Sequence, residues 1–144
     1  MKKTFAISGI CFVFVCLLYG DSGVWTVSGT VNVTEPGTVY LSLLTEDGFK
    51  NHYRAYQRIA LEIGEEDAKA GSISFEFTDV PSGDYSFSAF LDRNENGKLD
   101  MGMLGPKEPW GNYRCARPRM RGPKWEEIVF TVNGNTSDII IAIE

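Results

Sequence analysis

Short runs in which apolar and polar residues alternate are the feature that most constrains this chain. In each run aromatic or β-branched residues alternate with Ser, Thr or Asp, which gives a strand one buried face and one solvated face. The runs lie at residues 25–33, 38–44, 72–77, 84–90, 128–132 and 138–143. No amphipathic helix of useful length accompanies them, so the pattern predicts an all-β protein.

Residues 58–63 form a candidate seventh strand, because Ile59, Leu61 and Ile63 alternate there, whereas residues 51–57 before them fit a helical turn. Links rich in Gly, Pro and Asn lie at residues 35–37, 79–83 and 132–135. Gly and Asn accept positive φ and Pro fixes φ, so these links suit tight reversals and antiparallel neighbours. We therefore predict a single antiparallel β-sandwich of about seven strands with an Ig-like Greek key.

The first 20 residues have the organisation of a secretory signal peptide. Lys2 and Lys3 precede an apolar stretch at residues 5–19, and no acidic residue occurs before Asp21. The stretch is shorter than the roughly 20 residues that span a bilayer, which makes an uncleaved anchor the less favoured alternative. We expect export to the bacterial periplasm, the cell envelope or the extracellular space, with no membrane span after cleavage.

Removal of the signal peptide constrains the mature chain. It leaves Cys115 as the only cysteine, so no internal disulfide can form although export leads to an oxidising compartment. Lys2 and Lys3 belong to the 14 basic residues, which leaves 12 against 19 acidic ones and disfavours nucleic acid as a partner. Residues 24–144 suffice for one β-sandwich domain, and residues 92–124 are its one long loop.

The beginning of this loop resembles a calcium-binding loop. A calcium loop of the helix-flanked kind presents oxygen atoms at positions 1, 3, 5, 7 and 9, with glycine at position 6. The corresponding oxygens belong to Asp92, Asn94, Asn96, the Lys98 carbonyl and Asp100, and Gly97 is the glycine. Position 12 is Met103, so the usual bidentate carboxylate is missing. Glu108 is the candidate to replace it, provided that the chain folds back.

Two interpretations of this loop remain open. The first is a weak calcium site with a dissociation constant of about 10⁻⁴ to 10⁻³ M, because few formal charges surround the ion. The second is a plain turn, in which the Asp and Asn side chains hydrogen-bond the local backbone. The role is structural in either case, because no catalytic base or nucleophile accompanies the loop.

A basic stretch follows at residues 107–124 and holds half of the mature chain's basic residues. Arginine interleaved with aromatic residues is typical of binding surfaces, because guanidinium groups pair with carboxylate or phosphate while rings stack on planar or sugar faces. The candidate ligand-binding residues are Trp110, Tyr113, Arg114, Arg117, Arg119 and Arg121. The expected partner is an anionic glycan, a lipid headgroup or an envelope protein. Alternatively, these arginines pair with acidic residues of their own domain.

The residues offer little for catalysis or for zinc. His52 is the only histidine and Cys115 the only mature cysteine, which disfavours both a nucleophilic Cys–His pair and a zinc site. We therefore expect a non-enzymatic binding or structural module. The alternative is an enzyme or an enzyme-accessory domain whose site uses Arg and Asp residues of the 92–124 loop.

Several motifs raise a resemblance to a known family. They occur in order at residues 75–85, 92–100, 104–108, 110–111 and 122–127, followed by Phe130. This run resembles the bacterial secreted family called domain of unknown function 2141, over about half of the chain. The resemblance implies an exported β-sandwich similar to transthyretin-like and carboxypeptidase-regulatory-like domains, with no established activity.

Two positions depart from the family pattern. Leu91 stands where the family usually has a histidine before the first Asp, so no metal role of that histidine transfers to this chain. The family also has one more residue between the positions matched here by Gly105 and Pro106. The shorter link leaves the placing of Glu108 open.

The signal peptide generates the first prediction. The exported protein should begin near Asp21 or Gly23, because the small residues Gly20 and Ser22 lie where a signal peptidase cleaves. The intact mass of the protein recovered from the cell envelope or medium tests this. A mass that still includes residues 1–19 would instead mean an anchored protein.

Overall fold

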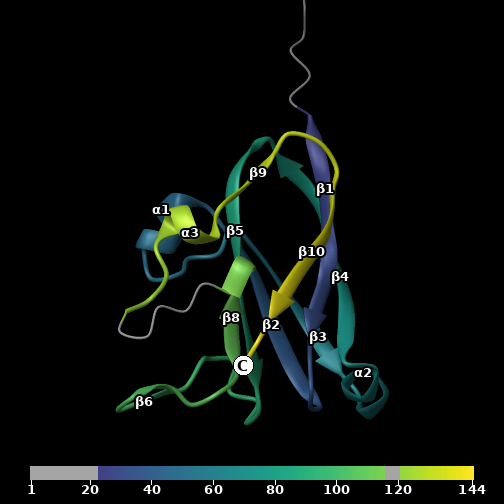
Figure 1. The fold of residues 1–144 in the computed structure, drawn as a ribbon, viewed down its shortest axis with the longest axis vertical. Helices are drawn as coiled ribbons and strands as arrows, with labels where there is room; N and C mark the ends of the chain where they lie inside the picture. The colour runs from purple at the N-terminus through teal and green to yellow at the C-terminus, as the bar shows by residue number, and fades with distance from the viewer. Residues whose placement is uncertain (1–22, 116–120) are drawn as a thin grey trace, which may run out of the picture.

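The computed structural model describes residues 23–115 and 121–144, about half of which lie in β-strands of two main sheets (Figure 1). The three-stranded sheet has the order β10 (Thr136–Ala142), β1 (Val24–Asn32), β4 (Ser72–Pro81). The five-stranded sheet has the order β3 (Gln57–Ile63), β2 (Gly37–Leu44), β5 (Gly83–Asp92), β8 (Trp110–Asn112), and β9 (Phe130–Val132) pairs with the start of β5. A separate hairpin joins β6 (Met101–Gly102) and β7 (Gly105–Pro106).

The helical segments are short and lie between strands. They are α1 (Glu46–Lys50), α2 (Glu65–Ala70), η1 (Tyr113–Cys115) and α3 (Trp125–Ile128). Thr45 caps α1, because its Oγ1 accepts the Gly48 N–H at 3.2 Å, and α2 ends at Gly71, whose φ is +85°. No helix of the described residues is long and apolar enough to cross a membrane.

An aromatic cluster connects the two sheets. Phe87 of β5 is fully buried, and its ring centroid lies 5.2 Å from that of Phe75 and 5.5 Å from that of Phe77, both on β4. Phe130 of β9 stacks on Phe87 from the same sheet, at 5.4 Å. These rings belong to a larger core that also takes Val27, Val31 and Ile141 from the three-stranded sheet and Val39, Leu41 and Leu43 from the five-stranded one.

The period-two pattern predicted the strands well. Each of the seven runs contains a strand, including the candidate at residues 58–63, which is β3. In β4, Phe75 and Phe77 point into the core while Glu76 is exposed, as alternation requires. The mostly-β class is therefore confirmed. The strand expected at residues 128–132 is shorter than its run, because Ile128 ends α3 and β9 begins only at Phe130.

The prediction that all strand neighbours are antiparallel was wrong. β1 and β10 pair in parallel, with Thr30 opposite Ile140 and Val31 opposite Ile141. The links at residues 79–83 and 132–135 do reverse the chain, but β4–β5 and β9–β10 each lie in different sheets. Turn residues specify a reversal only; whether the second strand pairs beside the first or packs over it depends on where their buried faces meet.

The expectation of a long loop without structure at residues 92–124 was also wrong. The segment contains the β6–β7 hairpin and β8, which pairs with β5 through Phe90–Trp110 and Ser88–Asn112. The Trp110 N–H donates to the Glu144 carbonyl at 3.1 Å, and the Glu144 N–H donates back to Trp110 at 3.2 Å. The bonds of β8 therefore tie the five-stranded sheet to the chain that follows β10.

Gly29 generates a prediction about the parallel pairing. A Cβ atom on Gly29 would lie 2.0 Å from the Ile139 carbonyl oxygen of β10, far inside van der Waals contact. Gly29→Ala should therefore lower the free energy of unfolding by about 2–4 kcal/mol, because β1 and β10 must separate. Gly134→Ala is the matched control, since nothing lies within 4 Å of its added Cβ. Urea unfolding measures both, and equal midpoints would contradict this register.

Candidate functional site

The acidic loop begins where β5 ends. Asp92, the last residue of β5, is only 1% exposed. Its Oδ1 accepts the Asn96 N–H at 3.3 Å, and its Oδ2 accepts the Gly97 N–H at 2.6 Å. Glu95 and Gly97 have φ values of +60° and +71°, which turns these amides inward. The chain therefore curls around the Asp92 carboxylate.

The other predicted side-chain ligands lie in one bonded ring. Asp100 accepts hydrogen bonds from the side-chain amides of Asn94, at 2.6 Å, and Asn96, at 3.0 Å. The Oδ1 atoms of these asparagines accept backbone N–H groups of Asn96 and Lys98, at 3.2 and 2.8 Å. The Lys98 side chain itself is exposed. The structure thus brings together Asp92, both asparagines and Asp100.

Glu108 folds back onto this loop. Its Oε1 accepts the Arg93 N–H at 2.9 Å and its Oε2 accepts the Asp100 N–H at 3.1 Å, so the carboxylate joins both ends of the loop. Its side chain is buried, at 6% exposure. A backbone hydrogen bond from Lys107 to the Asp100 carbonyl, at 2.8 Å, holds the returning chain in place. The sequence had left the position of Glu108 open.

The donor set fits a hard cation in its chemistry. Asp92 and Glu108 are buried carboxylates whose hydrogen-bond partners are neutral backbone N–H groups. Within residues 23–115 and 121–144 no basic side chain pairs with either, and Arg93 turns its guanidinium to Glu35 instead. Buried carboxylates without a counter-charge are costly, and oxygen ligands are those that calcium prefers.

The present geometry is not a closed metal cage. No three His, Cys, Asp or Glu side chains of the described residues gather around a common point. The side-chain amides of Asn94 and Asn96 direct nitrogen toward Asp100, so both would have to rotate to offer Oδ1 to a cation. The loop therefore brings the expected ligand residues together, but their side chains hydrogen-bond to one another and to the local backbone.

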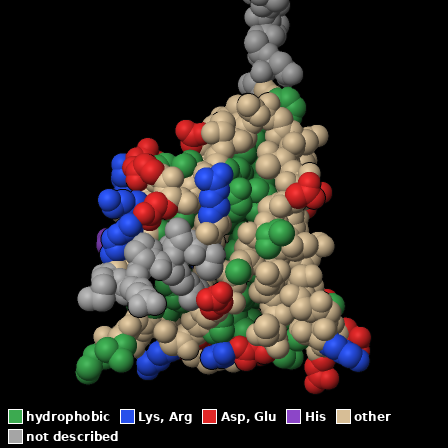
Figure 2. Space-filling view, viewed as in Figure 1, with side chains coloured by type: hydrophobic (Ala, Val, Ile, Leu, Met, Phe, Trp, Pro, Cys, Tyr) green, Lys and Arg blue, Asp and Glu red, His purple; other side chains and the backbone are tan. Residues whose placement is uncertain are grey.

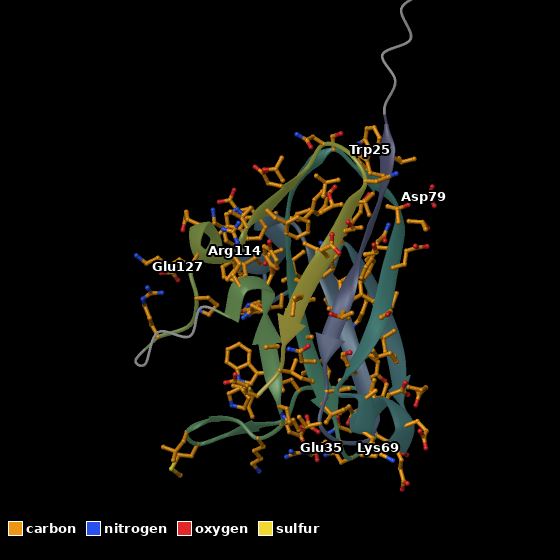
Figure 3. All side chains as sticks on the ribbon, turned by 45° about the vertical axis from the view of Figure 1, so that its right-hand side comes forward. Trp25, Glu35, Lys69, Asp79, Arg114 and Glu127 are labelled. Carbon is orange, nitrogen blue, oxygen red and sulfur yellow. The ribbon has the colours of Figure 1, made fainter. Side chains whose placement is uncertain are left out.

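The residues of the basic stretch are dispersed. Trp110 is half-buried on β8, and Tyr113 packs edge-on against Phe130 at 5.1 Å. Arg114 is exposed, and its guanidinium lies over the Tyr113 ring at 5.2 Å. Arg117 and Arg119 lie outside the described residues. In Figure 3 Arg114 lies on the same side of the molecule as Glu127.

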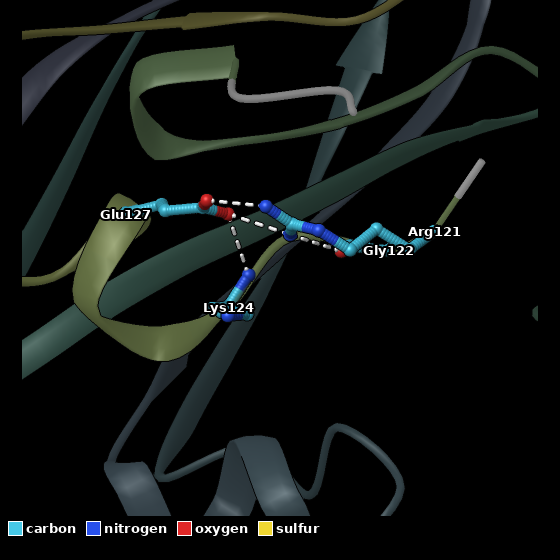
Figure 4. A network of polar contacts seen from close by, with 4 residues as sticks. All are labelled: Arg121, Gly122, Lys124 and Glu127. Atoms are coloured by element: carbon cyan, nitrogen blue, oxygen red, sulfur yellow. Dashed lines mark hydrogen bonds and ion pairs between the residues drawn. The ribbon is translucent and has the colours of Figure 1, made fainter. Parts of the chain in front are cut away.

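Arg121 forms an ion pair within the domain. Its Nη1 and Nη2 donate to the two carboxylate oxygens of Glu127 at 3.0 and 2.6 Å, and Nη1 also donates to the Gly122 carbonyl (Figure 4). The Lys124 N–H donates to the same carboxylate at 2.8 Å. For Arg121 the geometry favours the alternative of intramolecular pairing. Trp125, close by, is buried and packs against Phe49 at 5.7 Å.

A cleft that the sequence did not reveal lies on the outer face of the five-stranded sheet. It has a volume of about 1730 Å³. Its lining includes Ser42, Ser88, Phe90 and Trp110 of the strands, with Arg54 and Arg58 on one side. The β6–β7 hairpin adds Met101 and Leu104 on the other side, and its apolar end projects from the body of the molecule (Figures 1 and 2). Arg58 was detectable as outward-facing, because Ile59, Leu61 and Ile63 occupy the alternate positions of β3.

The comparison with known families gives one match. Residues 27–140 match the family described as "Uncharacterized protein conserved in bacteria (DUF2141)", and the chain belongs to it. The resemblance read from the motifs is thereby confirmed. Neither curated proteins nor solved structures include a significant match to the chain.

The Arg121–Glu127 pair predicts a pH dependence. Hydrogen bonds from Arg121 and from the Lys124 N–H lower the pKa of Glu127 from 4.5 to about 2. The pair therefore contributes its full stabilisation above about pH 4.5, and the contribution is lost as the pH falls through 2. Glu127→Gln should unfold at lower urea than wild type at pH 7, with a difference that shrinks toward pH 2 and with added salt. Exposed Glu126→Gln is the control, and a pH-independent difference would contradict the assignment.

Proposed function

We propose that this protein is an exported, non-enzymatic β-sandwich module that calcium stabilises and that has a binding or structural role at the bacterial cell envelope. The observation that carries the proposal is the pair of buried carboxylates, Asp92 and Glu108, that face neutral donors only. The proposed location at the cell envelope rests on the signal-peptide pattern of residues 1–20, which lie outside the described part of the chain.

The two main sheets are proposed to form a single sandwich of the transthyretin-like kind. The shared core supports this, because Phe75 and Phe77 of one sheet pack on Phe87 of the other. The parallel pairing of β1 with β10 gives this sandwich a mixed sheet. A sandwich that holds its core by packing leaves its outer faces and loops available for ligands.

Calcium would act in this loop as a counter-ion rather than as a catalyst. It would take oxygens from Asp92, Asn94, Asn96 and Asp100, the Lys98 carbonyl and Glu108, and would neutralise the two buried carboxylates. The hydrogen bonds of the loop already hold these residues near one another, and cation binding would require the two asparagine amides to rotate and the carboxylates to converge on a common point. Binding to the folded state alone raises its stability by mass action.

The arrangement of the acidic groups supports a non-enzymatic role. Both oxygens of Asp92 and both oxygens of Glu108 accept backbone N–H groups, which lowers their value as bases or nucleophiles. His52 is exposed on the link between α1 and β3. The rival proposal is an enzyme or accessory domain that uses Arg and Asp residues of the 92–124 loop. It would require one of these carboxylates to give up its hydrogen bonds to the backbone N–H groups.

The proposed partners follow from charge. The protein carries a net charge of −5, yet Arg114 is exposed and pairs with no acidic side chain among the described residues; its guanidinium lies over the Tyr113 ring. An anionic glycan, a lipid headgroup or an acidic envelope protein would complement such guanidinium groups. Nucleic acid is not proposed, because the overall charge would oppose it.

The calcium proposal is tested by thermal unfolding. With a dissociation constant near 10⁻³ M, 10 mM CaCl₂ is a tenfold excess and should stabilise the fold by about 1.4 kcal/mol, which raises Tm by roughly 4–6 °C. Asp100→Ala should abolish this increment, because it removes one ligand carboxylate. MgCl₂ at the same concentration controls for ionic strength, since Mg²⁺ requires stricter octahedral geometry.

Asp84→Ala is the matched control variant, since Asp84 is exposed on β5 and bonds Thr131 away from the loop. It should retain the calcium increment in full. An unchanged wild-type Tm in 10 mM CaCl₂ would refute the calcium site and leave the loop as a turn.

A further inference from the structure

Five residues that line the cleft, Ser42, Arg58, Ser88, Phe90 and Trp110, belong to two cross-strand rows on one face of the five-stranded sheet. In the first row Ser42 lies opposite both Arg58 and Ser88, and Ser88 lies opposite Asn112. In the second row Phe90 lies between Tyr40 and Trp110. Residues two apart on a strand share a face, so both rows face the same side. One row is polar and the other is aromatic.

Arg58 is positioned at one end of the polar row. Its guanidinium lies 4.9 Å from the Tyr40 ring centroid and 5.5 Å from that of Phe90, and these two rings stack on each other at 5.3 Å. Cation–π contact holds the guanidinium flat above the rings and leaves its N–H edges for another partner. Neither Arg58 nor Arg54 pairs with an acidic side chain within the described residues.

One side of the cleft is basic, although the protein as a whole is acidic. The lining also includes two acidic residues, Glu108 and Glu144. Glu108 accepts the Arg93 and Asp100 amides, and Glu144 has a partner of its own. Arg121 at the margin is paired with Glu127. The guanidinium groups of Arg54 and Arg58 have no acidic partner among the described residues, and they attract an anion to their side of the cleft.

The polar row has unused hydrogen-bonding capacity. Asn112 is 3% exposed, and its buried Oδ1 has no hydrogen-bond partner in the described structure. The hydroxyls of Ser42 and Ser88 likewise bond no other described residue, in contrast to Ser86, whose Oγ donates to the Ile128 carbonyl at 2.8 Å. Ser42 and Ser88 line the cleft, so a ligand hydroxyl can bond them there, whereas the Asn112 Oδ1 is buried out of its reach.

We propose that this cleft binds an acidic saccharide, which deepens and rests on the proposed binding role of the module. Arg54 and Arg58 pair with the carboxylate or sulfate groups, and Ser42 and Ser88 bond the sugar hydroxyls. Trp110, beside this row, offers ring surface to the apolar C–H face of a sugar.

The lining favours a saccharide over the two rival occupants. An acyl chain needs a continuous apolar surface, but Ser42, Ser88 and Arg58 interrupt this one. An extended peptide binds by adding a strand to a free sheet edge, whereas this cleft lies across the face of the sheet. The lining combines hydroxyl and guanidinium groups with aromatic ones, which matches a sugar ring that has both a polar rim and an apolar face.

The test is calorimetric titration of the full mature chain with a short oligogalacturonate. EDTA is present, because acidic saccharides bind calcium themselves. The wild type should bind, with affinity that falls as salt rises. Arg58→Ala should weaken binding at least about tenfold, and Arg58→Lys should rescue only part, since lysine keeps the charge but not the planar fork. Lys69→Ala is the matched charge control, because Lys69 lies on α2 at one end of the molecule (Figure 3), and it should bind like wild type.

Ser88→Ala provides a second variant. It removes a hydroxyl that lines the cleft and bonds no other described residue, so it should weaken saccharide binding without lowering Tm. Loss of binding together with a lowered Tm in this variant would contradict the assignment of Ser88.

Three results would overturn the cleft proposal. They are absence of oligogalacturonate binding by the wild type, equal binding of a neutral maltooligosaccharide, and Arg58-dependent binding of anionic phospholipid vesicles in place of the saccharide. The calcium increment in Tm is read separately on Arg58→Ala. An intact increment with no saccharide binding removes only the cleft proposal, and saccharide binding without the increment removes only the calcium role.

Discussion

The packing of Phe87 between the two sheets is the constraint on which the rest of the structure depends. Phe87 contacts two rings of β4 and one of β9, so it fixes β5 against both of these strands. Tyr85, Ala89 and Leu91 share this inward face and join the same core. Cys115 is the only cysteine of the described residues, so no disulfide joins two of them. The stability of this part of the chain therefore comes from buried apolar area.

The opposite face of β5 carries the polar features. Ser86 bonds the Ile128 carbonyl, Ser88 and Phe90 line the cleft, and Asp92 holds the acidic loop. Three of these four are buried although they point away from the core, because α3, Arg58 and the loop cover them. A strand with one core face and one covered polar face explains why a chain of this size can hold both a candidate ion loop and a cleft on one sheet.

The sequence predicted the features that depend on residues close together in the chain, and it missed those that depend on contacts between distant segments. Alternation located the strands, and the spacing of Asp and Asn located the bonded ring of residues 92–100, because both are local properties. The parallel pairing of β1 with β10 and the place of β8 beside β5 depend on which segments meet after folding. The place of Arg58 over two rings could not be predicted, because Tyr40 of β2 and Phe90 of β5 meet beneath it only after folding. Phe90 lies 32 residues after Arg58 in the sequence.

The candidate loop and the cleft are mechanically joined through the residues between them. Glu108 lines the cleft and also joins the two ends of the loop, and the next residue, Pro109, accepts the Leu91 N–H at 2.9 Å. Trp110 then pairs with Phe90 and bonds Glu144. If both proposals hold, a cation that fixes Glu108 also fixes the backbone that presents Trp110. Linkage then requires reciprocity: the factor by which calcium raises saccharide affinity equals the factor by which the saccharide raises calcium affinity.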